Sequence, residues 1–155
     1  MHWKLGLSSI SGSAVAALGA LALASLAVPA GAHHSYAMFD MNKAMAREGR
    51  VAKLDWTNPH ISLWLYVPKA GQQGQYDLWR FQSDAPAKAA RAGWSKSVFE
   101  VGERITIHYF PLRDGAKGGY VINVVRADGS ELIGDRDAPG VAQAQDKLRS
   151  SRGAR

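Results

Sequence analysis

The chain has 155 residues and a formal net charge of +6 at pH 7, with 19 lysines and arginines against 13 acidic residues. It contains no cysteine, which excludes disulfide bonds and a lipid-modified N-terminal cysteine. We expect a chain of this length to form one domain, with no room for a second.

The first 32 residues have the organisation of a cleaved signal peptide. Lys4 is the only fixed charge before an Ala- and Leu-rich stretch, 10–28, which ends in Pro29-Ala30-Gly31-Ala32. A charged start, an apolar middle and a small-residue end are typical of secretory signals. A transmembrane anchor is the alternative, but Ala, Gly and Ser make the stretch weakly hydrophobic for that role. We expect cleavage between Ala30 and His33, a periplasmic location and no stable membrane anchor afterwards.

In the next part of the chain, apolar and polar residues alternate as they do in short strands separated by turns. The expected strands are residues 45–54, with a bend or bulge at Gly49, then 60–67, 76–82, 105–110 and 120–126. A short helix over about Ala85 to Ala92 separates the third strand from the fourth. Ser83 or Asp84 is expected to cap this helix, Gly93 to end it, and Trp94 to pack back on it.

This order of elements predicts an all-β protein with one short helix. Three strands, a helix and two strands form the oligonucleotide/oligosaccharide-binding (OB) order, a small five-stranded barrel. We place this OB-like barrel at residues 33–133. Its ligand surface is expected on strands two and three, together with the loops that join strands one to two and four to five. Residues 134–155 carry scattered basic residues among Ala, Gly, Gln and Ser, and we predict a disordered basic tail there.

Two motifs carry a resemblance to a known family. His33-His34-Ser35 follows the signal peptide, and Trp56-Thr57-Asn58-Pro59-His60 follows the first strand. With Arg91-Ala92-Gly93-Trp94 and the segment 111–115, they resemble an uncharacterised family of exported bacterial proteins with a His-His-Ser start and a Trp-x-Asn-Pro-His motif. The resemblance implies a periplasmic protein with a small barrel. It implies no substrate, cofactor or mechanism.

The histidines near the expected mature N-terminus form a candidate metal site. Cleavage after Ala32 would place the new amine beside the imidazole of His33, and these two nitrogens suit copper(II) or another divalent metal. Cleavage after Ala30 would instead place His33 third in the chain, a spacing that also chelates copper or nickel. His34 and His60 are the candidate further ligands. The alternative is that a His-His segment binds divalent ions weakly and without purpose.

A second set of candidate residues would bind a ligand without a metal. Trp56 and Asn58 lie in the first expected ligand loop, and Arg113 lies in the loop expected to face it. Trp64, Tyr66 and Arg80 would form an outward aromatic platform with a cation beside it on strands two and three. In the alternative interpretation Trp56 plugs the barrel end, and Tyr36 and Phe39 cover the platform.

The sequence contains neither a nucleophile motif nor a close pair of carboxylates on neighbouring strands, and we expect no enzymatic activity. Export argues against a nucleic-acid partner. The predicted function is therefore a periplasmic binding module, with copper or another divalent metal at His33, His34 and His60 as the specific hypothesis. The alternative is a metal-free module that holds an envelope protein, a glycan or a small anion on the face of strands two and three.

Overall fold

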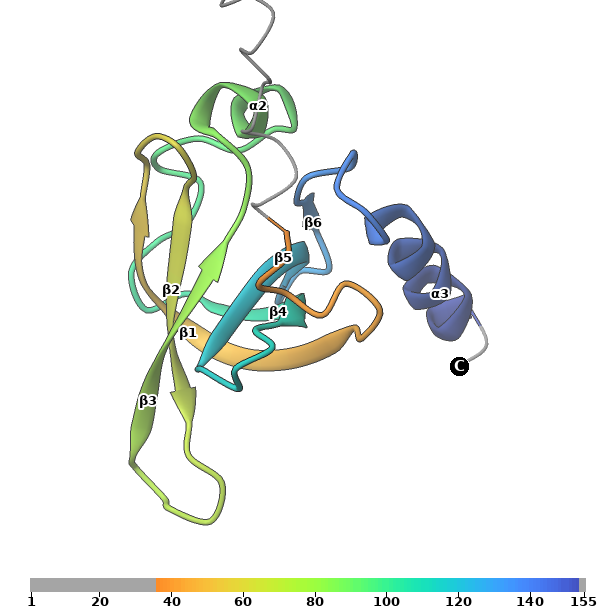
Figure 1. Cartoon of the computed structure of the whole chain (residues 1–155). Coiled ribbons are helices and arrows are strands. Elements are labelled where there is room, and N and C mark those ends of the chain that lie inside the picture. Colours follow the sequence, from red (N-terminus) through yellow and green to blue (C-terminus); the bar gives the residue numbers. More distant parts are fainter. Residues whose placement is uncertain (1–35, 154–155) are drawn as a thin grey trace, which may run out of the picture. The chain divides into compact units, whose positions relative to one another are not determined.

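A computed structural model describes residues 36–153 of the chain, and its elements follow the expected order (Figure 1). The strands are β1 (Met45–Asp55), β2 (Ser62–Pro68), β3 (Tyr76–Gln82), β4 (Arg104–Pro111), β5 (Gly118–Arg126) and β6 (Glu131–Ile133). The helices are α2 (Pro86–Arg91) and α3 (Val141–Gly153). The short helix between β3 and β4 confirms the fold class.

The sheet closes on itself into a small barrel. Its strand order is β3-β2-β1-β4-β5-β6, with β1 pairing antiparallel to both β2 and β4. A parallel pairing of Arg80–Gln82 in β3 with Gly118–Tyr120 in β5 closes the barrel. The expected five-stranded barrel is therefore present, and β6 adds a short antiparallel strand beside β5 that we had not predicted.

Alternation of apolar residues builds the interior of the barrel as expected. In β2, Leu63, Leu65 and Val67 point inward and are buried. Inward side chains of the other strands, α2 and the segment after it complete this core: Val51, Ile61, Phe81, Ala89, Trp94, Phe99, Ile105, Ile107, Tyr109, Val121 and Val124. The alternating faces were therefore predicted correctly for every inward position of β2.

The bend expected at Gly49 in β1 is shifted along the strand. The register with β2 slips between Val51 and Lys53, two residues after the glycine. Gly49 itself lies where β2 crosses closely, because a Cβ atom there would stand 2.9 Å from the carbonyl oxygen of Tyr66. The glycine is needed for this close approach, and the irregular pairing follows it.

Helix α2 is capped differently from our prediction. Its N-cap residue is Ala85, and no side chain caps it, so the expected cap by Ser83 or Asp84 is wrong. Asp84 instead accepts a hydrogen bond from the Ala85 amide at 2.9 Å. Gly93 has a φ of +91° and ends the helix as predicted. Trp94 follows it, is buried in the core and donates from Nε1 to the Ile133 carbonyl at 2.7 Å.

The structure corrects the prediction of a disordered tail from residue 134. The Gly134 amide donates to the Ile122 carbonyl at 2.9 Å, and α3 follows after a turn. Ala138, Val141 and Ala144 are buried in a second apolar cluster with Phe39, Phe110, Tyr120 and Ile122. The helical spacing of these small apolar residues was hidden by the charges around them. Neither helix in residues 36–153 is long and apolar enough to cross a membrane.

Replacement of Gly119 should test the barrel closure. A Cβ atom at Gly119 would lie 2.2 Å from the Phe110 carbonyl oxygen and 2.5 Å from the Tyr109 ring. Because these neighbours belong to the buried core, we expect Gly119→Ala to lower the free energy of unfolding by more than about 2 kcal/mol. Gly153 has no neighbour within 4 Å of the same position, so Gly153→Ala is the control. Equal stability of the two variants in urea denaturation would contradict the packing described for β5.

Candidate functional site

Three of the predicted ligand-binding residues lie together on the outer face of the barrel. Trp64 in β2 pairs with Lys53 in β1 on one side and with Arg80 in β3 on the other. Tyr66 is the next outward residue of β2 and pairs with Leu78. The alternation of the strands therefore brings Trp64, Tyr66 and Arg80 to one surface, as predicted.

Trp64 lies between two cations. The Lys53 Nζ is 5.1 Å from the centre of the Trp64 ring, and the Arg80 Cζ is 6.0 Å from it. Such contacts are favourable because the ring face carries partial negative charge. The indole Nε1 donates to Asp55 at 2.7 Å, and Arg80 Nε donates to Ser62 Oγ at 3.2 Å. We call these five residues, Lys53, Asp55, Ser62, Trp64 and Arg80, the Trp64 cluster.

The charges of the Trp64 cluster are only partly paired. Lys53 forms an ion pair with Asp55 at 3.0 Å. The hydrogen bond from Lys53, together with the one from Trp64, holds the pKa of Asp55 below its ordinary value against the opposing effect of burial. Arg80 has no carboxylate within ion-pair distance among the described residues, so its terminal guanidinium nitrogens remain available. The cluster can therefore accept an anionic group beside Arg80.

An exposed apolar surface adjoins the Trp64 cluster. Tyr66, Tyr76 and Leu78 are each about half exposed, at 49%, 50% and 46%. Tyr36 and Phe39 do not cover this surface, contrary to the alternative interpretation. Their rings pack instead on Tyr120, with centroid distances of 5.2 and 5.4 Å. The outward face of β2 and β3 thus retains exposed aromatic groups.

The loop between β1 and β2 holds the remaining predicted residues of the first ligand loop. Trp56 packs against the barrel core, which supports a structural role. Asn58 is exposed and precedes Pro59 through a cis peptide bond. His60 is partly buried, and its Nδ1 is buried without a hydrogen-bond partner. His60 therefore places a buried polar atom without a partner in this loop.

Arg113 is not brought to His60. Its Nε donates to the Ala37 carbonyl at 3.2 Å, and its amide donates to the Met38 carbonyl at 2.9 Å. The β1–β2 loop lies on the side of α2, whereas the β4–β5 loop lies at the other end of the barrel (Figure 1). Arg113 thus fastens residues 37–39 to the barrel, and the expected single mouth formed by both loops is absent.

The structure describes one of the three candidate metal ligands, His60. His33 and His34 lie outside the described residues. Within residues 36–153, no group of three or more His, Cys, Asp or Glu side chains is arranged to hold a metal ion. His60 is therefore the one predicted metal ligand whose surroundings are described.

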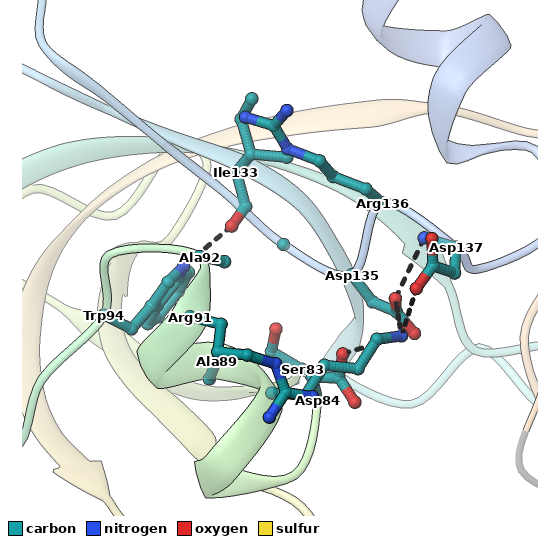
Figure 2. A pocket seen from close by; sticks show the side chains of 12 residues that line it. Ser83, Asp84, Ala89, Arg91, Ala92, Trp94, Ile133, Asp135, Arg136 and Asp137 are labelled. Carbon is teal, nitrogen blue, oxygen red and sulfur yellow. Dashed lines mark hydrogen bonds and ion pairs between the residues drawn. The ribbon is translucent and has the colours of Figure 1, made fainter.

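A polar network that the sequence did not indicate lies between α2 and the segment after β6 (Figure 2). Asp135 is buried at its centre and accepts hydrogen bonds from Lys88, from Tyr36 at 2.7 Å and from Tyr120 at 3.2 Å. Lys88 also contacts Asp84 at 3.0 Å and Asp137 at 3.1 Å. We call this set the Asp135 network. It joins the N-terminal segment, α2, β5 and the start of the C-terminal segment.

The protonation states of the Asp135 network follow from these contacts. Burial alone would raise the pKa of Asp135, but hydrogen bonds from Lys88 and Tyr36 hold it below the ordinary value. Burial likewise acts to lower the pKa of Lys88, yet its three carboxylate partners raise it above the usual range. Burial raises the pKa of Tyr120 far above its ordinary value. At neutral pH the network therefore holds an ionised Asp135, a charged Lys88 and a neutral Tyr120.

Replacement of Asp135 should show how much this network contributes to the free energy of unfolding. Asp135→Asn leaves Lys88 without its buried counter-charge, and we expect a loss of about 2–4 kcal/mol in the free energy of unfolding. Asp137→Asn is the matched control, because its side chain also contacts Lys88 but is 80% exposed. Since the folded-state pKa of Asp135 is lowered, its contribution is complete above about pH 4 and is lost as the pH falls further. Denaturation at pH 7 and pH 3 would contradict this if both variants lost the same stability at both pH values.

Comparison with known proteins gives a family but no function. The sequence matches a family of unknown function (DUF6152) over residues 20–121, which span most of the barrel. No curated protein and no solved structure matches the chain. The matched region contains the His-His-Ser and Trp-x-Asn-Pro-His segments on which the resemblance was based. The chain therefore belongs to the DUF6152 family, whose function is unknown.

Proposed function

We propose that this protein is an exported, non-enzymatic binding module that holds an acidic glycan on the outer face of β1, β2 and β3. The observation that carries this proposal is the Trp64 cluster, in which Lys53 and Arg80 flank one indole ring. An OB-like barrel offers this same face to its ligands, including oligosaccharides.

The charges of the face favour an anionic ligand. Arg80 retains unpaired guanidinium nitrogens, and Arg50 lies on the same face, where β1 pairs it with Tyr66. Asp55 is the acidic member of the Trp64 cluster. Its carboxylate already forms an ion pair with Lys53 and accepts a hydrogen bond from Trp64. A carboxylate or sulfate of a glycan can form charge-assisted hydrogen bonds with Arg80 without displacing an existing ion pair.

The aromatic groups favour a ligand with ring faces. Two cations contact the Trp64 ring, so this ring positions Lys53 and Arg80 more than it offers a stacking surface. Tyr66 and Tyr76 are about half exposed and present the open aromatic area beside the cluster. The apolar faces of sugar rings pack against such side chains while their hydroxyl groups remain in water. The combination therefore suits a sugar chain that carries negative charge.

Binding to polygalacturonate oligomers, with neutral cello-oligomers as the uncharged comparison, tests this proposal. We expect saturable binding of the acidic oligomers that weakens as the salt concentration rises. Arg80→Gln should weaken it about tenfold, because a charged hydrogen-bond donor is lost. Tyr66→Ala should weaken it about fivefold through the loss of ring contact.

Arg149→Gln is the control, since Arg149 is an exposed cation on α3, away from this face. Equal loss of affinity in Arg149→Gln and Arg80→Gln would mean that net charge alone attracts the polymer. Equal binding of acidic and neutral oligomers would also contradict the proposal.

A second candidate function is copper(II) binding by the mature N-terminus. Two observations support it. The buried Nδ1 of His60 has no hydrogen-bond partner, and the Tyr36 hydroxyl donates a hydrogen bond to Asp135 at 2.7 Å. Lys88 links Asp135 to Asp84, and the Asp84 carbonyl accepts the amide of Ile61, which follows His60.

This chain of contacts connects Tyr36 to Ile61, the residue that follows His60. His33 precedes Tyr36 by three residues, a span of at most about 10 Å. The mature amine, His33 and His34 would then start from a fixed point on the barrel. In this second candidate they bind copper(II), with His60 as a further ligand.

Calorimetric titration with copper(II) tests this candidate on the mature chain, a form with one extra N-terminal glycine, and His60→Ala. We expect both changes to weaken binding at least tenfold, and we expect affinity to fall as the pH drops through about 6.5, where protons compete for imidazole. Trp64→Ala is the control, because it lies in the other proposed site. Equal affinity of the first three proteins would overturn the candidate.

A further inference from the structure

We propose that the outer face of β1, β2 and β3 holds its ligand at two subsites, the Trp64 cluster and a second one beside Tyr66, and that the ligand is an acidic glycan with negative charges on separate sugars. This inference rests on the proposed function, because the Trp64 cluster is the first subsite. The second subsite consists of Arg50, Tyr66 and Tyr76, which line a hollow of about 160 Å³. Arg50 is exposed and both tyrosines are about half exposed, so a ligand can touch all three side chains.

The irregular pairing of β1 brings cations of both subsites to the outer face. Side chains alternate between the two faces of a regular strand, so Arg50 and Lys53, three residues apart, would point in opposite directions. In the structure, Arg50 pairs with Tyr66 and Lys53 pairs with Trp64, so three steps along β1 match two steps along β2. The extra residue is a bulge, and it places both cations beside successive outward residues of β2.

Each subsite contains one arginine without a carboxylate partner. In the Trp64 cluster this residue is Arg80. In the second subsite it is Arg50, which donates to the Gly102 carbonyl at 3.0 Å and forms no ion pair among the described residues. Arg104 lines the same hollow but is already paired with Glu48. An anionic group can therefore bind at Arg50 without displacing an ion pair.

The positions of the two arginines determine the length of the ligand. Arg80 on β3 pairs with Trp64, and Arg50 on β1 pairs with Tyr66, so they flank β2 at successive outward positions. Two residues along a strand advance about 7 Å and two strand spacings add about 10 Å, which places the two backbone positions roughly 12 Å apart. The bond to Gly102, just before β4, also holds the Arg50 guanidinium on the side of β1 away from β3.

One sugar cannot reach both arginines across this distance. The ligand must cross β2 diagonally and carry a negative charge toward each end. Its path passes over Tyr66, whose exposed ring can pack against a sugar face between the two charges. The two contacts then belong to one chain, so the second forms at a high effective concentration and strengthens binding. The face therefore selects an oligomer with repeated charges over a single acidic sugar.

Calorimetric titration with three compounds tests the inference: galacturonate, tetragalacturonate, and cellotetraonate, which has the same length but a single carboxylate at one end. We expect tetragalacturonate to bind at least tenfold more tightly than the other two, because it alone reaches both arginines. Arg50→Gln should weaken tetragalacturonate binding about tenfold and cellotetraonate binding less than twofold, since cellotetraonate can still bind at Arg80. Tyr76→Ala should weaken tetragalacturonate binding about threefold.

Arg149→Gln is again the control, because it changes the net charge by the same amount from an exposed position on α3. The comparison of the three compounds on the unmodified chain does not depend on any variant. Equal affinities for tetragalacturonate and cellotetraonate, both weakened by Arg80→Gln, would overturn the second subsite and leave the proposed function intact. If no acidic compound binds, or if Arg80→Gln leaves binding unchanged, the proposed function fails and this inference fails with it.

Discussion

The close approach of β5 to β3 is the constraint on which the rest of the structure depends. The pairing is parallel and short, and the amide of Arg80 donates to the Lys117 carbonyl at 3.1 Å. A Cβ atom at Gly118 would lie 2.0 Å from the Arg80 carbonyl oxygen, so only glycine allows the two backbones to meet. This contact fixes Arg80 at the closing edge of the barrel, beside Trp64. After Gln82, the Ser83 amide donates to the Ile61 carbonyl at 3.1 Å, and the chain continues into α2.

The sequence allowed prediction of the barrel because alternation in a strand is a local property. Leu63, Leu65 and Val67 are separated by two residues each, and this spacing places them on one face wherever the strand lies. The same rule placed Trp64, Tyr66 and Arg80 on one outer surface. Gly93 ended α2 for a similarly local reason, because its left-handed backbone favours glycine.

Contacts between distant segments could not be predicted in this way. Tyr36 and Asp135 are separated by 99 residues, and neither stands in a pattern that indicates the other. Alternation identified Phe110 and Tyr120 as strand residues but did not show that their outer side would be covered by Phe39, Val141 and Ala144. Residues 134–155 were predicted to be a disordered tail because scattered charges outnumber these small apolar residues. The prediction that Arg113 faces the first ligand loop failed because its partner, Ala37, lies 76 residues away in the sequence.

The cations of this protein differ in whether a carboxylate already pairs with them. Lys88 is paired and has a structural role, whereas Arg80 remains available for binding. Lys88 has three carboxylate partners, one of them on the buried Asp135, so an incoming anion would compete with existing ion pairs and gain little. Arg80 has a hydroxyl and an aromatic face as partners, which orient the guanidinium without neutralising it. An anion beside Arg80 therefore gains a charge-assisted hydrogen bond at a small cost in ordering. The distinction depends on the partners of each cation, not on its exposure. It favours Arg80 over Lys88 as the cation of the glycan-binding face that we propose, while the Asp135 network stabilises the fold.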